Sequence, residues 1–122
     1  MHKIILLREA LEDFVREQGL TIDDVLDAMD ESSEGIIESL LMRVDITEEE
    51  ALALERTFTA RQLNLLIFAL HVFYIANPSG YYKGYVIYPP PEAVLGPDGR
   101  VTRKGLYMII RSLGLTPGKP LR

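Results

Sequence analysis

The segment from Leu63 to Ala76 places the strongest constraint on the fold, because 14 consecutive residues are apolar apart from Asn64 and His71. A membrane-spanning helix needs about 20 apolar residues, so this shorter segment predicts a helix inside a soluble protein with no membrane partner. The lack of Cys agrees with a cytoplasmic setting. A helix that is apolar nearly all round is buried at the centre of a domain or lies in a subunit interface. Hydrophobic residues make up 48% of the chain, which is enough to build a core around such a helix.

The same helix carries more apolar surface than one small domain easily hides. We therefore predict a homodimer, with Leu66, Leu70 and Phe73 in or near its interface. His71 is expected to be a core or interface histidine rather than a metal ligand, because no second ligand is near it in the sequence.

Helical spacing of apolar residues, bounded by good capping residues, predicts further helices along the chain. Thr47 with Glu50, and Thr59 with Gln62, form the capping-box pattern, in which two side chains satisfy free backbone amides at a helix N-terminus. The aromatic and β-branched residues 81–88 predict a strand. The expected helices span residues 3–18, 22–29, 34–43, 48–56, 60–76 and 103–113.

These elements predict a mainly α fold, a helix-turn-helix-containing helical bundle with a short β element at about residues 81–88 and a C-terminal helix. Residues 1–76 form the bundle, and residues 77–122 form a strand, a turn and the last helix, which we expect to pack on the same domain. The predicted core consists of the apolar residues that caps and periodicity direct inward, namely Leu7, Leu11, Val25, Met29, Ile36, Leu40, Leu52 and Leu54.

Charge is divided unevenly between the two halves of the chain. Residues 1–57 hold 16 acids and 5 bases, and residues 58–122 hold 2 acids and 8 bases, so the halves carry net charges of −11 and +6. Two such surfaces could attract each other, within a monomer or between subunits. Alternatively, the basic end meets nucleic acid, or the acidic face meets a basic partner. The bases from residue 100 onward are Arg100, Arg103, Lys104, Arg111, Lys119 and Arg122.

Catalysis and cofactor binding find no support in the sequence. The chain has no Cys, which excludes a thiolate metal site and a cysteine nucleophile, and it has no phosphate-binding loop, serine-hydrolase elbow or paired-histidine zinc motif. We therefore expect a protein that is not an enzyme and that binds no metal or cofactor. The tyrosines at positions 81, 82, 85 and 88 could stack on bases, but such a run more often forms a half-buried strand.

One half of the chain resembles a known family. A glycine-led helix start, two apolar core positions, and a serine before an apolar residue follow one another at the spacing of a helix-turn-helix; they are Gly19-Leu20-Thr21, Val25, Met29, Ser32 and Ile36. Residues 43–56 then read R-V-D-I-T-E-E-E-A-L-A-L-E-R. On these residues, segment 1–58 resembles the Cro/XRE-type DNA-binding domains, most closely the HigA-type antitoxins, with its helix-turn-helix at 21–43.

The resemblance is degenerate, because Leu26, Asp30 and Glu31 stand where the family has a small residue, a glycine and a buried Val or Ile. It implies a small helix-turn-helix DNA-binding transcriptional regulator of bacterial or phage type, whose recognition helix starts around Ser32 and Ser33. The residues it places at DNA are Ser33, Glu34, Gly35, Ile37 and Glu38. We expect the phosphate contacts to come from Arg43 and from the basic end, chiefly Arg103, Lys104 and Arg111.

An alternative function follows from the same residues. Two of those placed at DNA are acids and none is basic, and carboxylates there oppose binding to phosphates. The chain would then be a non-enzymatic protein-interaction module, an inhibitor or assembly factor, that presents Glu34 and Glu38 to a basic protein partner. If basic residues surround the third helix, the regulator is favoured. If acidic residues surround it, the interaction module is favoured.

Overall fold

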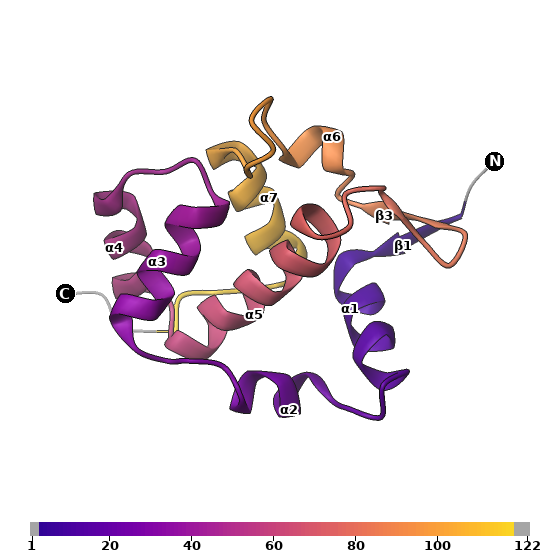
Figure 1. Cartoon of the computed structure of the whole chain (residues 1–122), viewed down its shortest axis with the longest axis horizontal. Helices are drawn as coiled ribbons and strands as arrows, with labels where there is room; N and C mark the ends of the chain where they lie inside the picture. Colours follow the sequence, from indigo (N-terminus) through magenta and orange to yellow (C-terminus); the bar gives the residue numbers. More distant parts are fainter. Residues whose placement is uncertain (1–2, 119–122) are drawn as a thin grey trace.

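The structure is a computed structural model that describes residues 3–118. Helices build most of it, and three short strands form a small sheet at one end (Figure 1). The predicted mainly α fold with a short β element and a C-terminal helix is confirmed. The elements are β1 (Ile4–Leu6), α1 (Leu7–Arg16), α2 (Ile22–Asp27), α3 (Ser33–Arg43), α4 (Glu48–Thr57), α5 (Ala60–Leu70), the π-helix η1 (His71–Ile75), β2 (Tyr81–Tyr82), β3 (Tyr85–Tyr88), α6 (Pro91–Val94) and α7 (Arg103–Ser112).

Helix α5 is the central element, because its apolar circumference needs neighbours on every side. Helices α2, α3 and α4 pack against it, and most of its residues are buried. The buried amide of Asn64 donates a hydrogen bond from Nδ2 to the carbonyl oxygen of Asp30 at 3.0 Å. Within residues 3–118, no helix combines the length and the apolar character needed to cross a bilayer.

The burial of this segment overturns the predicted interface residues. Leu66 and Leu70 are 0% exposed and Phe73 is 2% exposed within a single chain, so they offer no surface to a second copy. The sequence shows how apolar a helix is but not how many neighbours cover it. His71 does not lie in the core, since the π-helix places this side chain at the surface; its place in an interface stays a prediction. A homodimer through other residues stays a prediction.

Side-chain caps begin the helices where the sequence predicts them. The hydroxyl of Thr47 accepts a hydrogen bond from the backbone N–H of Glu50, and that of Thr59 accepts one from Gln62, both at 3.1 Å. Both boxes close reciprocally, and α2 begins with a third one. Each box satisfies amides that lack a partner inside the helix, so local sequence is enough to fix these N-termini.

The small sheet departs from the predicted elements. Strand β1 takes the place of the first residues of the helix predicted over 3–18 and pairs in parallel with β3. Strand β2 pairs antiparallel with β3, so residues 81–88 form a hairpin rather than one strand. The hairpin turns at Lys83 and Gly84, whose φ angles are 51° and 83°. Periodicity missed both features, because a short apolar run fits a helix or a strand and pairing over 80 residues leaves no local signal.

A short loop before α7 fastens the C-terminal part of the chain to the end of α3. The N–H of Asp45 donates to the carbonyl of Val101 at 2.8 Å, and the N–H of Val101 donates to the carbonyl of Arg43 at 2.9 Å. Helix α7 then packs on α6 at Gly105, where a Cβ atom would stand only 2.4 Å from the carbonyl oxygen of Val94. Buried residues from α1 to α7 belong to one hydrophobic core.

The predicted core is confirmed for most of its members. Five of the eight residues are buried, namely Leu7, Leu11, Ile36, Leu40 and Leu54. The other three, Val25, Met29 and Leu52, are half-buried. The half-burial of Leu52 has a structural cause, because it lies beside a surface groove that is described below.

Replacing Leu40 with alanine should lower the free energy of unfolding by about 2–5 kcal/mol, because the side chain is 0% exposed and its loss leaves a cavity under α3. Met42→Ala on the same helix is the matched control, since Met42 is 63% exposed and should change stability by no more than about 0.5 kcal/mol. Urea denaturation measures both. Similar small changes in the two variants would show that α3 turns a different face to the core.

Candidate protein-interaction groove

A shallow groove of about 740 Å³ crosses the outer surface of α3 and α4, which lie side by side at the end of the molecule opposite the strands (Figure 1). Its lining includes four residues predicted to meet DNA or a partner, namely Ser33, Glu34, Ile37 and Glu38. The remaining lining residues were not predicted as site residues; they are Leu41, Met42, Glu48 and Leu52. We call this surface the α3–α4 groove.

The floor of the groove is apolar, because the apolar side of α3 is wider than the core requires. Leu40 is buried in the core, whereas Ile37 and Leu41 lie toward the groove and stay half-buried. Met42 is 63% exposed, and α4 contributes the half-buried Leu52. Concave apolar surfaces rimmed by polar groups are typical of sites that bind another protein segment.

The rim of the groove is acidic. The carboxylates of Glu34, Glu38 and Glu48 are exposed, and no basic residue among residues 3–118 lines the groove. None of the three forms an ion pair with any residue in the range 3–118, although the chain has many bases in its second half. Within that range no three His, Asp or Glu side chains gather closely enough to hold a metal ion. The rim is therefore suited to cationic side chains spread along a partner.

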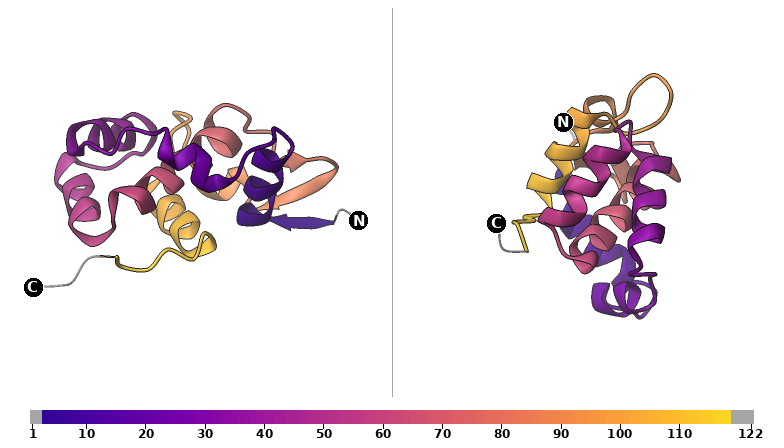
Figure 2. Two further views of the ribbon diagram at one scale, coloured as in Figure 1. Left: turned by 90° about the horizontal axis from the view of Figure 1, so that it is seen from below. Right: turned by 90° about the vertical axis from the view of Figure 1, so that its left-hand side faces the viewer.

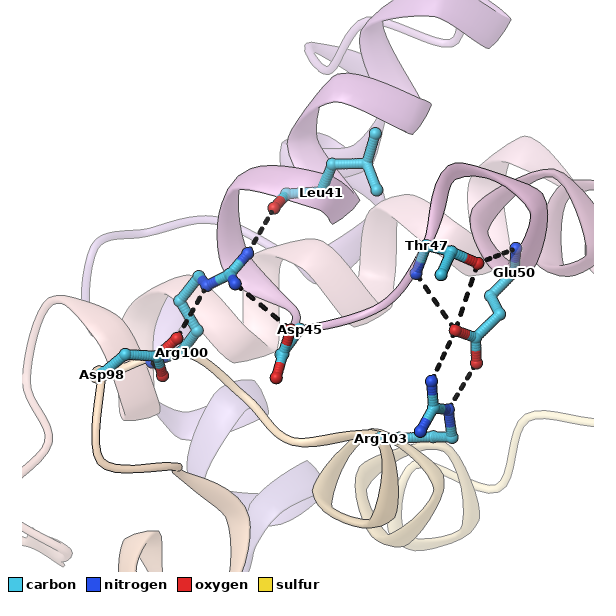
Figure 3. Close-up of polar contacts among 7 residues, drawn as sticks. All are labelled: Leu41, Asp45, Thr47, Glu50, Asp98, Arg100 and Arg103. Carbon is cyan, nitrogen blue, oxygen red and sulfur yellow. Dashed lines mark hydrogen bonds and ion pairs between the residues drawn. The ribbon is translucent and has the colours of Figure 1, made fainter.

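The acidic and basic halves of the chain attract each other within the folded molecule. Arg103 at the start of α7 forms a two-pronged ion pair with Glu50 of α4, with Nε–Oε2 and Nη2–Oε1 distances of 2.5 and 2.6 Å (Figure 3). The Glu50 carboxylate also accepts a hydrogen bond from the N–H of Thr47. The Arg103 guanidinium, followed by the Thr47 amide, lowers the pKa of Glu50 to about 2. The pair joins α7 to α4.

Arg100 makes a second connection in the same region (Figure 3). Its Nη2 lies 3.2 Å from Oδ1 of Asp45, and its Nη1 donates to the carbonyl oxygen of Leu41 at 3.3 Å. That carbonyl belongs to the last turn of α3, where carbonyls lack helical partners and a cation is favourable. Arg100 therefore ties the loop before α7 to the C-terminal end of α3.

Two further bases pair with acids of the first half. Lys83, in the turn of the hairpin, contacts Asp13 at 2.9 Å and also pairs with Glu17, and Tyr82 donates from its hydroxyl to Asp13 at 2.8 Å. Lys83 holds the pKa of the Asp13 carboxyl well below its usual range. Arg61 of α5 contacts two aspartates of α2. Attraction between the two halves within one chain is confirmed for these four bases.

The structure does not bring the predicted phosphate contacts to the groove. The guanidinium of Arg43 is half-buried, donates to the carbonyl of Ser39 at 3.2 Å, and has an Nε atom that is buried with no hydrogen-bond partner in the described part of the chain. Arg103 is engaged by Glu50. Lys104 and Arg111 lie on α7, which is on a different side of the molecule from α3 (Figure 2). Lys119 and Arg122 lie outside the described residues.

Helix α7 presents a second surface of mixed character, which we call the α7 stripe. Its residues recur at positions i, i+3, i+4 and i+7; they are Lys104, Tyr107, Met108 and Arg111. Tyr107 is 50% exposed, and neither Lys104 nor Arg111 forms an ion pair in residues 3–118. A hollow of about 260 Å³ continues the stripe onto the sheet and is lined by Leu6, Tyr88, Pro89, Met108, Arg111 and Ser112.

Comparison of the chain with protein families, with curated proteins and with solved structures gives no match. The resemblance of segment 1–58 to Cro/XRE-type domains therefore stays a prediction. The two helices of the predicted helix-turn-helix have different principal neighbours, since α2 packs on α1 and α5 while α3 packs on α4 and α5.

Replacing Arg103 with glutamine should raise the pKa of Glu50 from about 2 toward its ordinary value of 4.5, because the largest cause of the shift is removed. A lowered carboxyl pKa stabilises the fold above the pKa of the unfolded chain and is lost as pH falls through the folded value. The wild type should therefore lose this contribution between about pH 4.5 and 2, and the variant should lose less there.

A carbon-detected NMR titration of the Glu50 carboxyl, with urea unfolding at several pH values, measures the change. Lys104→Gln is the matched control, because the neighbouring lysine makes no contact with Glu50. An unchanged pKa of Glu50 in Arg103→Gln would contradict the proposed cause.

Proposed function

We propose that the chain is a non-enzymatic protein-interaction module whose α3–α4 groove binds a basic amphipathic helix of a protein partner. One observation carries this proposal: the outward face of α3 has an apolar floor under a rim of carboxylates that form no ion pair within residues 3–118. A phosphate backbone would be repelled by such a rim, whereas lysines and arginines would be attracted to it. The interaction module is thus favoured over the DNA-binding regulator.

The shape and chemistry of the groove match a known mode of peptide recognition. An amphipathic helix lays its apolar side into a groove between two helices, with anchors one turn apart. Ile37 and Leu41 are themselves one turn apart on α3, and Leu52 faces them from α4. Glu34 and Glu38 follow the same spacing along the edge, so cations one turn apart on the partner would meet one carboxylate each.

A synthetic helical peptide with leucines on one side and lysines along its flanks should bind the wild type, as measured by fluorescence anisotropy with a labelled peptide. Replacing Glu34 and Glu38 with glutamine should weaken binding about fivefold, because two exposed ion pairs contribute about 0.5 kcal/mol each. Binding should also weaken as salt is raised.

Glu9→Gln with Glu12→Gln is the matched control, since it removes the same charge from two exposed residues of α1, outside the groove. A peptide with glutamates in place of the lysines should not bind. Equal affinity of the groove variant and the control variant for the lysine peptide would overturn the proposal.

A DNA-binding regulator is the second candidate function, and one observation favours it. Lys104 and Arg111 are exposed, free of intrachain ion pairs within residues 3–118, and nearly aligned along α7 because they are seven residues apart. Two such cations can address one phosphate backbone together. Arg100 and Arg103 are less available to phosphates, because carboxylates of α4 and of the loop before it already engage them.

We expect no appreciable binding of duplex DNA at physiological salt, because the acidic surface of α3 and α4 repels phosphates more strongly than Lys104 and Arg111 attract them. Filter binding over a salt titration measures this. If the wild type instead binds DNA, Lys104→Gln with Arg111→Gln should weaken it for all sequences and reduce the salt slope by up to about two units. That result would favour the regulator over the interaction module.

A further inference from the structure

The α7 stripe has the features that the α3–α4 groove requires of a partner. It is a helical surface with two apolar side chains, Tyr107 and Met108, between two cations, Lys104 and Arg111. The cations are seven residues apart, which is about 10 Å along a helix axis. The groove offers the complementary order, an apolar floor between carboxylates. The two surfaces therefore match in polarity and in charge.

The two surfaces of one chain do not meet each other. Among the described residues, those that line the groove run from Ser33 to Leu52, so α7 contributes nothing to it. Helices α3 and α7 lie on different sides of the molecule (Figure 2). The ion pair between Arg103 and Glu50 fixes the first turn of α7 against α4. The α7 stripe can therefore contact an α3–α4 groove only in a second molecule.

We propose that the α7 stripe of one copy docks into the α3–α4 groove of a second copy. The proposal rests on the proposed function of the groove and names its partner as another molecule of this chain. Tyr107 and Met108 lie over the apolar floor, and Lys104 and Arg111 pair with the rim glutamates. Leu6 and Tyr88, which are 50% and 49% exposed beside the stripe, extend the apolar contact.

A contact between two different surfaces leaves one surface of each kind uncovered, so assembly does not stop at two copies. After one contact forms, the first copy still has an empty groove and the second still has an uncovered stripe. Further copies therefore add head to tail, as a closed ring or as an open chain, and association depends on concentration. Because the contact pairs carboxylates with cations at an exposed rim, it weakens as salt is raised.

Sedimentation velocity of the full chain, from low concentration to about 100 μM at low salt, tests the proposal. The wild type should form species larger than 13.8 kDa. A groove variant, Glu34→Lys with Glu38→Lys, and a stripe variant, Lys104→Glu with Arg111→Glu, should each associate at least about tenfold more weakly. The control variant Glu9→Lys with Glu12→Lys makes the same charge change as the groove variant on α1 and should associate like the wild type.

Mixing the two variants shows whether the surfaces bind each other. The groove variant retains its stripe and the stripe variant retains its groove, so an equimolar mixture should associate although each alone stays largely monomeric. The fourfold variant, which reverses both surfaces, should regain self-association. All the altered side chains are exposed, and circular dichroism checks that each variant is folded.

The outcomes separate this inference from the proposed function. A wild type that stays monomeric yet binds the lysine peptide overturns self-docking and leaves the groove as a site for another protein. Association that persists in the groove variant, or a mixture that stays monomeric, also overturns self-docking. A chain that neither associates nor binds the lysine peptide overturns both proposals. Association lost in each variant and restored in the mixture supports both.

Discussion

A helix that is apolar around most of its circumference has to be covered on every side, and the packing of this protein follows from covering α5. Helices α2, α3 and α4 each give it one face, and the strands and α7 complete the same core. An α-helix turns only part of its surface toward one neighbour. The apolar side of α3 is wider than the surface that it turns toward α5. The apolar residues of α3 that α5 and the core leave uncovered form the floor of the groove.

Ion pairing decides which charges remain available at the surface. Arg61, Lys83, Arg100 and Arg103 meet acids of the first half, so four of the bases of the second half join elements of the fold. These pairs fix the hairpin to α1 and the start of α7 to α4. The acids of the groove rim and the cations of the α7 stripe remain without intrachain ion pairs in residues 3–118. The two surfaces are complementary because the ion pairs within the chain do not neutralise the carboxylates of the one or the cations of the other.

The sequence predicted the local parts of this arrangement well. The capping boxes at Thr47 and Thr59 mark the starts of α4 and α5, because a box needs only residues three positions apart. The groove itself was not predicted, although Glu34, Ile37 and Glu38, which line it, were among the residues expected to meet DNA or a protein partner. Leu52 was predicted as core, because spacing alone does not show whether a half-buried leucine faces α5 or a groove.

The sequence by itself determined that the chain is mainly helical, where most helices begin, and that its halves carry opposite charge. These properties depend on hydrogen bonds and periodicities within a few residues, and on composition. Only the tertiary structure decided that Leu66 and Leu70 are covered by their own chain, that β1 pairs with β3, and that Arg103 meets Glu50. Each of these joins residues that are far apart in sequence. Their approach is set by the packing of the whole core, so no local pattern encodes it.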